Sequence, residues 1–433
     1  MKILDAAALD LAEFVRPGET VAWGQGAAEP LSLTRALAAQ GSRLGGIRAF
    51  MGIGACDTFA PEHAEHIEFL SYCGSGSNRA LARAGRLDIL PSHYSALPEL
   101  IASEKLKIDV LMLQLAPADN SGRYSLGLAS DYLLAALARA RVVLAEINDQ
   151  VPWTYGERWL TEADIDAAVM VSRPLPETRS STVGSIENEI GRHVAGIVED
   201  GTTLQTGIGN IPEAILKALD GHRDLGVHSG IIGDGIADLV LRGVVTNSRK
   251  SIDRGVSVTG LAMGSSRLYR LIARNPSIFF RGTGYTHDPL VLAKIDRFVA
   301  INSAIEVDLS GQVNAEVANG VYVGAIGGAT DFLRAAARSH GGAPVIALPA
   351  RAGGRSRIVA RLGGPVTTAR SDAGLIVTEY GVADLRGLPL AARAERMLAI
   401  AHPADRDSLA HAAYGIRKHG CAEQLQGSGP SIF

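Results

Sequence analysis

Short runs of aliphatic and β-branched residues alternate along the chain with longer Ala-, Leu- and Arg-rich stretches, and Gly, Pro and Asn separate them. The apolar runs predict strands, among them Thr20–Trp23, Val110–Leu115, Val142–Ile147, Thr203–Thr206, Phe298–Asn302, Pro344–Leu348 and Leu375–Thr378. The longer stretches predict helices, among them Leu31–Ala39, Ser130–Ala140, Ile211–Leu219 and Leu390–Ile400. This alternation predicts an α/β fold with mostly parallel sheets.

Two landmarks recur in the second half of the chain. The segment Gly18–Pro30 resembles Gly201–Pro212, since each reads as a turn, a strand, a glycine loop and a helix start. The segment Ile108–Leu126 parallels Phe298–Val317, and both offsets are roughly 180–190 residues. The repeat predicts two tandem, related open α/β domains, residues 1–175 and 182–433, joined by the Pro- and Ser-rich segment 172–181. Chance similarity between ordinary α/β segments is the alternative.

Composition excludes several classes of protein. The 433 residues carry 42 Lys and Arg against 45 Asp and Glu, and this balance argues against nucleic acid or an anionic membrane surface as a partner. Acidic residues interrupt Met1–Val15, where a signal peptide would be apolar, and no uncharged apolar run is long enough to span a bilayer. Cys56, Cys73 and Cys421 form no CxxC pair, and no HxxxH spacing occurs. We therefore expect a cytoplasmic protein without a metal site.

Glycine loops follow several predicted strands. Gly24–Gly26 and Gly207–Gly209 read Gly-x-Gly, but the third glycine of a dinucleotide fingerprint is replaced by Glu29 or Pro212, which argues against an NAD-dependent enzyme. Such loops bring backbone N–H groups close to a phosphate or an oxyanion, or simply make a tight turn. The richest loop, Val323–Asp331, leads into a helical stretch, and its N–H groups suit a developing negative charge. The absence of a Gly-x-Ser-x-Gly elbow argues against a hydrolase triad.

Two carboxylates follow predicted strands, Glu306 and Glu379. Glu379 comes directly after an apolar strand, and open α/β sheets hold their ligands at the carboxyl ends of the strands. An exposed or helix-capping acid is the alternative for both residues.

Longer segments resemble a known family. They read TGIGNIPEAI (Thr206–Ile215), LGVHSGIIGDGIADLV (Leu225–Val240), INSAIEVDLSGQVNAE (Ile301–Glu316), GGATDFLRAA (Gly327–Ala336) and VTEYGVADLRG (Val377–Gly387), with DVLMLQLAPADNSGRYSLG (Asp109–Gly127) in the first half. Through these segments, which cover nearly the whole chain in order, the protein resembles the acetyl-CoA hydrolase/transferase family. That family includes 4-hydroxybutyrate CoA-transferases and belongs with the class I CoA-transferases.

The resemblance implies two α/β halves of shared fold, with CoA and the acyl group in the cleft between them. It implies coenzyme A as cosubstrate without a tightly bound cofactor, an acyl-CoA and a small carboxylic acid as partners, and a homodimer or homotetramer. In the family, a glutamate attacks the thioester to form a mixed anhydride. CoA then returns to give an enzyme-glutamyl thioester and is passed to the acceptor acid in a ping-pong route.

The resemblance also assigns roles to residues. Gly327 and Gly328 match the oxyanion-hole loop, Asn302 matches an asparagine that hydrogen-bonds the reacting carboxyl group, and Glu379 matches a carboxylate that positions the reacting groups. The residues expected to contact the acyl group or CoA are Gly207, Ile208, Gly209, His228, Ser229, Arg355 and Arg357. The two arginines suit the CoA phosphates, although a solvated surface turn would look the same.

One position departs from the family. The family's nucleophilic glutamate follows a His-Ser or Tyr-Thr pair, and here His228 and Ser229 are followed by Gly230. Glycine has no side chain, so the glutamyl anhydride cannot form there. The glutamine that follows the glycine pair in the family is also replaced, by Ala329. Together these changes indicate a subgroup with altered chemistry.

Three interpretations remain open. The first is a CoA-transferase that moves CoA between a short acyl-CoA and a carboxylic acid, with a nearby carboxylate, Glu306 by motif, as nucleophile. The second is an acyl-CoA hydrolase or non-covalent acyltransferase, in which the Gly327 and Gly328 amides polarise the thioester and Glu379 acts as base. The third is a non-catalytic homologue that binds a CoA-like ligand. Resemblance over the whole chain favours the first, and the site residues alone favour the second.

Overall fold

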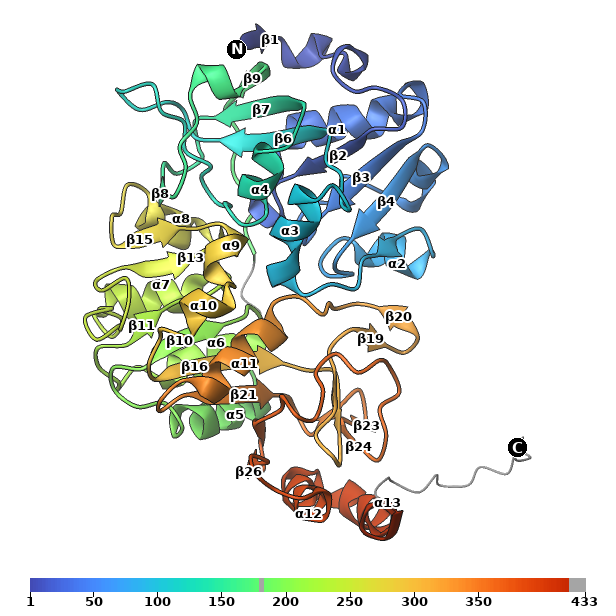
Figure 1. Ribbon diagram of the computed structural model, residues 1–433, viewed down its shortest axis with the longest axis vertical. Coiled ribbons are helices and arrows are strands. Elements are labelled where there is room, and N and C mark those ends of the chain that lie inside the picture. The colour runs from blue at the N-terminus through green and yellow to red at the C-terminus, as the bar shows by residue number, and fades with distance from the viewer. Residues whose placement is uncertain (179–182, 420–433) are drawn as a thin grey trace.

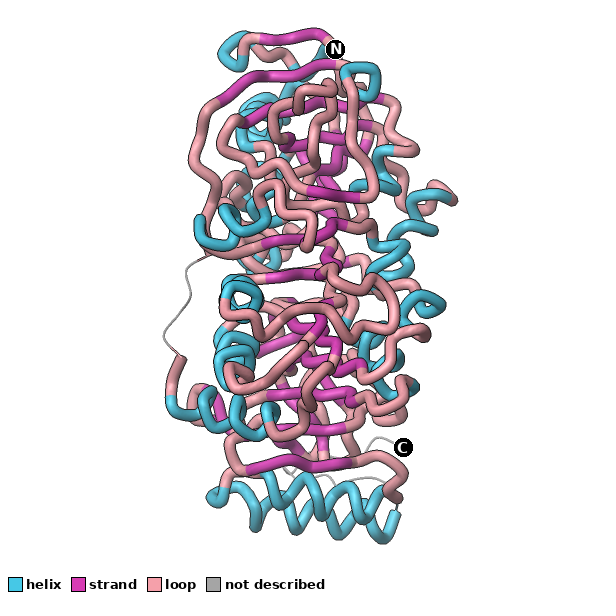
Figure 2. The backbone as a smooth tube through the Cα atoms, turned by 90° about the vertical axis from the view of Figure 1, so that its left-hand side faces the viewer, coloured by secondary structure: helices cyan, strands magenta, loops and turns pink. Residues whose placement is uncertain are grey.

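The computed structural model describes residues 1–178 and 183–419 and is built from two α/β halves (Figure 1). The end of the predicted linker, residue 182 at the start of the second predicted domain, and Cys421 lie outside the described residues. Strands run through the middle of the molecule with helices on both sides (Figure 2). The predicted fold class, two tandem α/β domains, is confirmed.

The first half contains an eight-stranded parallel sheet. Its strands are, in spatial order, β1 (Lys2–Leu4), β9 (Ala167–Val171), β7 (Val142–Asn148), β6 (Val110–Leu115), β2 (Thr20–Trp23), β3 (Ile47–Met51), β4 (Ile67–Ser71) and β5 (Asp88–Ile89). β6 and β7 are buried along their whole length, as expected for parallel strands covered on both faces. The helices of this half are α1 (Leu31–Gln40), α2 (Arg79–Arg83), α3 (Leu97–Ala102) and α4 (Leu133–Leu137).

The second half contains a six-stranded sheet, in which only the pairing of the last two strands is antiparallel. The strands are, in spatial order, β11 (Gly226–Val227), β10 (Thr203–Thr206), β16 (Phe298–Ser303), β21 (Ala343–Ala347), β25 (Leu375–Thr378) and β26 (Gly381–Asp384). The helices are α5 (Ser185–Ala195), α6 (Asn210–Ala218), α7 (Asp234–Leu241), α8 (Ser266–Ile272), α9 (Thr283–Thr286), α10 (Pro289–Leu292), α11 (Ala329–Arg338), α12 (Leu390–Ile400) and α13 (Arg406–His419).

The two halves repeat one strand order. β2 lies between β6 and β3 in the first half, and β10 lies between β16 and β11 in the second. All four pairings are parallel. The internal repeat matches β2 with β10, and these two strands therefore have equivalent neighbours in their sheets. The glycine loops that follow β2 and β10 begin at equivalent strand ends.

Small sheets and a shared core join the halves. β8 (Tyr155–Gly156) of the first half pairs with β15 (Ile278–Phe280), which pairs with β13 (Ser257–Thr259). One hydrophobic cluster includes Leu111 and Leu204, which lie on central strands of the two different sheets. The remaining strands are β12 (Ile231–Ile232), β14 (Leu261–Ala262), β17 (Glu306–Asp308), β18 (Val313–Asn314), β19 (Val317–Ala318), β20 (Val321–Tyr322), β22 (Arg351–Ala352), β23 (Arg355–Ser356) and β24 (Ile358–Val359).

One predicted helix is wrong in length. The sequence predicts a helix over Ser130–Ala140, whereas α4 begins only at Leu133 and ends at Leu137. The N–H groups of Ser130 and Asp131 instead donate to the Gly260 carbonyl of the second half, at 2.9 and 3.3 Å. This contact joins the segment before the helix to the second half, through N–H groups that would have no acceptor inside a helix. Within the described residues, no helix is both long and apolar enough to cross a membrane.

Candidate active site

A cavity of about 210 Å³ lies between the two halves. The first half lines it with Gln25, Tyr72, Cys73 and Tyr94 among others, and the second half with Gly230, His287, Asn302, Gly327 and Gly328 among others. Within the described part of the chain, no Asp or Glu lines this cavity. It therefore offers amides, hydroxyls, a thiol and an imidazole to a ligand, but no carboxylate.

The glycine loop Val323–Asp331 is held in place by the first half. The Tyr94 N–H donates to the Gly327 carbonyl at 2.9 Å. Ser95 donates to the Asp331 carboxylate from both its N–H, at 3.2 Å, and its hydroxyl, at 2.8 Å. Because both halves fix the loop, its N–H groups are positioned before any ligand arrives.

Helix α11 begins at the cavity wall, with Gly328 as its N-cap residue. Its first backbone hydrogen bond runs from the Phe332 N–H to the Gly328 carbonyl at 3.2 Å, so the earlier N–H groups have no acceptor inside the helix. Gly327 has a φ of +55°, which glycine adopts without strain. Such N–H groups at a helix start attract negative charge. The arrangement suits the oxyanion hole predicted for Gly327 and Gly328.

Two amide side chains face the cavity from neighbouring strands. Asn302 lies near the end of β16, and Gln205 lies in the adjacent β10. Asn302 Nδ2 donates to Gln205 Oε1 at 2.9 Å, and Gln205 Nε2 donates back to Asn302 Oδ1 at 3.4 Å. The pairing fixes both amides at the carboxyl end of the strands, where open α/β sheets bind ligands.

The imidazole of His287 occupies the space beside Gly230. A Cβ on Gly230 would lie 2.7 Å from Cε1 and 2.9 Å from Nε2 of His287, and a Cβ on Gly328 would overlap the same Nε2. The ring packs between Tyr94 and Phe332, with centroid distances of 4.9 and 4.5 Å. Burial lowers the pKa of His287 to about 3, so its imidazole is neutral at pH 7.

The predicted carboxylates do not line the cavity. Glu379 follows β25 and accepts a hydrogen bond from the Ala350 N–H at 2.8 Å. Glu306, in β17, accepts from the Asn314 side chain at 3.0 Å and from the Gly363 N–H at 2.6 Å. Both carboxylates accept a hydrogen bond from a backbone N–H group, and their catalytic roles stay predictions.

The predicted acyl-CoA contacts are divided between the cavity and its surroundings. Gly207 lines the cavity, and Ile208 and Gly209 continue the same loop into α6. His228 and Ser229 are buried outside the lining, where the Ser229 hydroxyl donates to the Thr206 carbonyl at 2.9 Å and His228 Nε2 donates to the Thr286 carbonyl at 3.2 Å.

Arg355 and Arg357 lie in and directly after β23, outside the cavity lining. Arg355 is exposed and donates to the Asn319 side chain at 3.1 Å. Their contact with CoA phosphates stays a prediction.

The first half contributes a polar wall that local sequence patterns do not reveal. Gln25 Nε2 donates to the Tyr94 hydroxyl and to Asp131 Oδ2, both at 2.7 Å, and Gln25 Oε1 accepts from the Tyr72 hydroxyl at 2.7 Å. Burial raises the pKa of Asp131 to about 6. In the sequence, only the internal repeat indicates that Gln25 belongs to the site. Gln25 lies in the loop after β2, and the repeat matches this loop with the loop after β10, which carries Gly207.

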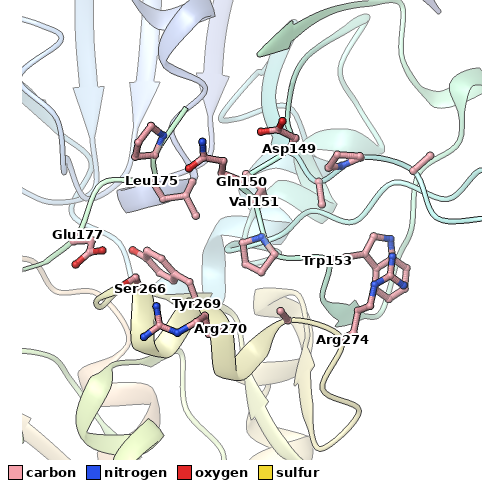
Figure 3. A pocket seen from close by; sticks show the side chains of 16 residues that line it. Asp149, Gln150, Val151, Trp153, Leu175, Glu177, Ser266, Tyr269, Arg270 and Arg274 are labelled. Carbon is pink, nitrogen blue, oxygen red and sulfur yellow. The ribbon is translucent and has the colours of Figure 1, made fainter. Parts of the chain in front are cut away.

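A second hollow of about 590 Å³ lies elsewhere along the boundary between the halves. Figure 3 shows Gln150 and Leu175 on one side of it and Tyr269 and Arg270 of α8 on the other. Among the described residues, the two hollows share no lining residue. The loop amides and the imidazole therefore belong to the smaller cavity alone.

Comparison with known proteins identifies similar sequences over most of the chain. Residues 4–173 match the acetyl-CoA hydrolase/transferase N-terminal domain, and residues 264–413 match the C-terminal domain of the same name. The chain is 40% identical over 338 residues to 4-hydroxybutyrate coenzyme A transferase of Clostridium kluyveri, covering 77% of this chain and 79% of that protein. It is 34% identical over 410 residues to succinyl-CoA:cyclohexane-1-carboxylate CoA transferase of Geobacter metallireducens, covering 94% of each.

A solved structure shows the same architecture. RipA of Yersinia pestis superimposes with a TM-score of 0.91 at 34% identity, covering 96% of this chain and 98% of that one. The fold, with a cavity between its two halves, is that of the CoA-transferase class of enzymes. The chain belongs to the acetyl-CoA hydrolase/transferase family.

Proposed function

We propose that this protein is a CoA-transferase that moves CoA between a short acyl-CoA and a carboxylic acid. The observation that carries the proposal is that Gly327, Gly328 and the hydrogen-bonded Asn302–Gln205 pair line one cavity between the halves. A volume of about 210 Å³ suits a short acyl group better than a long chain. The names of the two relatives above, both CoA transferases, support the same activity.

The cavity groups have separate roles in this proposal. The thioester carbonyl oxygen accepts hydrogen bonds from the Gly327 and Gly328 N–H groups, which stabilise the negative charge that develops when the carbonyl carbon is attacked. The side chain of Asn302, held by Gln205, orients the acceptor carboxylate. Because neither group has to move during the reaction, little reorganisation energy is needed.

The overall exchange balances without a proton. The C–S bond of the donor thioester breaks, a new C–S bond forms to the carbonyl carbon of the acceptor acid, and one acceptor oxygen leaves with the donor's acyl group as a carboxylate. CoA is a cosubstrate in this scheme, and no tightly bound cofactor takes part.

The wider setting of the enzyme is part of the proposal. We place the domain boundaries at residues 1–175 and 182–433, on either side of the Pro- and Ser-rich linker. We propose a cytoplasmic homodimer or homotetramer, in line with the family resemblance. Neither nucleic acid nor a membrane surface is a partner in this scheme.

Hydrolysis of the acyl-CoA is a second candidate. One observation favours it: within the described residues, no carboxylate lines the cavity, so a glutamyl anhydride cannot form there. Water would then take the acceptor's place, and free CoA and the acid would be the products.

The deciding experiment incubates the purified protein with a panel of short acyl-CoAs, with and without acetate, and follows free thiol and new acyl-CoA separately by mass. New acyl-CoA that forms only with acetate supports transfer. Free CoA released at the same rate with or without acetate supports hydrolysis instead. Absence of both products with every acyl-CoA would refute both activities.

A further inference from the structure

We propose that His287 is the nucleophile of this enzyme and takes the acyl group on Nε2, in place of the glutamate whose position Gly230 occupies. The inference rests on the proposed function, because it names the reacting group of the same cavity. It replaces the predicted role of Glu306, which lies outside the cavity lining.

The position of Nε2 is the first argument. A Cβ on Gly230 would lie 2.9 Å from His287 Nε2, so the ring nitrogen stands where a side chain at position 230 would begin. A Cβ on Gly328 would overlap the same atom, so Nε2 also lies directly beside the backbone of the glycine loop at Gly328. A nucleophile next to preorganised N–H donors is the geometry that acyl transfer requires.

The hydrogen bonds of Thr286 orient the ring. Oγ1 of Thr286 lies 3.3 Å from the Gly282 carbonyl and 2.8 Å from His287 Nδ1, and in this proposal the Thr286 hydroxyl donates to the carbonyl and accepts from Nδ1. The hydrogen on Nδ1 leaves Nε2 with a free lone pair. The Thr286 carbonyl accepts from His228 Nε2 at 3.2 Å, so His228 is a positioning residue that holds this orientation.

Other side chains of the cavity are weaker candidates. Burial raises the pKa of the Cys73 thiol, which keeps it protonated and poorly nucleophilic. Burial also raises the pKa values of Tyr72 and Tyr94 well above their ordinary range. Burial lowers the pKa of His287, so its ring nitrogen is unprotonated at neutral pH.

The transfer reaction requires His287 to act as a nucleophile and gives it no role as a general base. The acceptor of a transferase is a carboxylate, which carries no proton for a base to remove at neutral pH. His287 Nε2 attacks the thioester carbon, the C–S bond breaks, and CoA stays bound as the thiolate beside the acyl-imidazolium. The acceptor carboxylate then attacks the acyl carbon and frees Nε2, giving a mixed anhydride of the two acids. The thiolate attacks the acceptor carbonyl carbon and releases the donor's acid.

The test is a single turnover with acetyl-CoA and no acceptor, quenched in acid and mapped by peptide mass, beside a transfer assay with acetate and a second acyl-CoA. In the wild-type protein, we expect the acetyl mass on the peptide that contains His287. His287→Gln should lose this adduct and lose transfer by at least about 1,000-fold. His340→Asn is the matched control, because His340 is an exposed histidine outside the cavity lining, and should behave as wild type.

Chemical rescue separates a reacting imidazole from a space-filling one. His287→Ala leaves a ring-sized hole, and we expect free imidazole to restore acetyl-CoA consumption in this variant. Pyrrole has a similar shape but no free ring lone pair, and should restore nothing. Thermal unfolding and CoA binding of both His287 variants show that they are folded.

The outcomes separate this inference from the proposed function. If the wild type transfers CoA while folded His287→Gln keeps a rate within tenfold, the inference is overturned and the function stands. An acyl group on the Cys73 peptide, or CoA itself bound covalently to the protein, overturns it equally. If the His287 peptide is acylated but no acceptor yields new acyl-CoA, the inference stands and transfer is refuted.

Discussion

His287 and Gly230 are complementary: the imidazole of one fills the space that any side chain at the other would need. A Cβ on Gly230 would lie 2.7 Å from His287 Cε1, which is closer than packed carbon atoms approach. The ring cannot easily withdraw, because Tyr94 and Phe332 pack against it. A glutamate at position 230 and a histidine at position 287 in its present orientation are therefore incompatible, and the absence of the family's nucleophile is built into the packing of the cavity.

Restoring the glutamate should require removing the histidine. We expect Gly230→Glu alone to be destabilised by about 1–3 kcal/mol through overpacking and to be inactive. Gly230→Glu combined with His287→Ala should recover stability and react by the family's glutamyl route, so that borohydride inactivates it in the presence of acyl-CoA. Unfolding by urea and activity after borohydride treatment measure the two effects. A double variant no more stable than Gly230→Glu would show that the two positions do not compete for space.

Gly328 should tolerate no side chain. Gly328→Ala would place a methyl group on His287 Nε2, and we expect a loss of transfer of more than about 100-fold, because a small displacement of reacting groups is costly. Binding of CoA should change much less, since CoA extends beyond the cavity. Rates and CoA affinity measured side by side test this. Equal losses in both would indicate that the residue supports binding only.

The anchoring of α11 by the first half should matter for catalysis as well as for stability. Ser95→Ala removes the hydroxyl that donates to Asp331 at 2.8 Å and leaves a largely buried carboxylate with one hydrogen bond fewer. We expect a cost of about 1 kcal/mol in unfolding free energy. We also expect kcat to fall while KM changes little, because the loop amides lose their fixed position. An unchanged kcat in a measurably destabilised variant would separate the anchor from the active site.

The buried His287 should lower the free energy of unfolding at acidic pH. Its pKa is about 3 in the folded protein against an ordinary value of 6.5, so the unfolded chain binds one more proton between these values. Stability therefore declines as the pH falls from about 6.5 towards 3, by about 1.4 kcal/mol per pH unit for this group. Comparing wild type with His287→Gln isolates this contribution, because His228 and Asp131, which also titrate there, are present in both. Parallel stability curves for the two proteins between pH 6.5 and 5 would contradict the burial argument.

The sequence predicted the central strands well, because each is a short run rich in aliphatic and β-branched residues between turn residues. Thr20–Trp23 and Thr203–Thr206 occur with the predicted bounds, and the repeat that they mark is visible in the strand order of both sheets. The predicted oxyanion loop, Gly327 and Gly328, also lies at the cavity. These features are encoded locally, by composition and by glycine spacing.

The remainder of the site depends on contacts between distant segments. His287 lies between two short helices, α9 and α10, and no local pattern indicates that it meets Gly230 and Gly328. Glu306 has the expected residue type after a strand, yet backbone and side-chain donors hold it away from the cavity lining. Asp288 and Pro289 give a helix-start signal beside His287, but such a signal places a helix and not a cavity.

The central claim is that CoA is transferred without a carboxylate of the protein, and oxygen labelling tests it most directly. A single turnover is run with unlabelled acyl-CoA and an acceptor acid that carries heavy oxygen in its carboxylate. Because the two acids form a mixed anhydride with each other, we expect the released donor acid to carry one heavy oxygen in this first turnover. An unlabelled donor acid, with the heavy oxygen retained by the protein, would show that a glutamate or aspartate of the chain takes part and would contradict the claim.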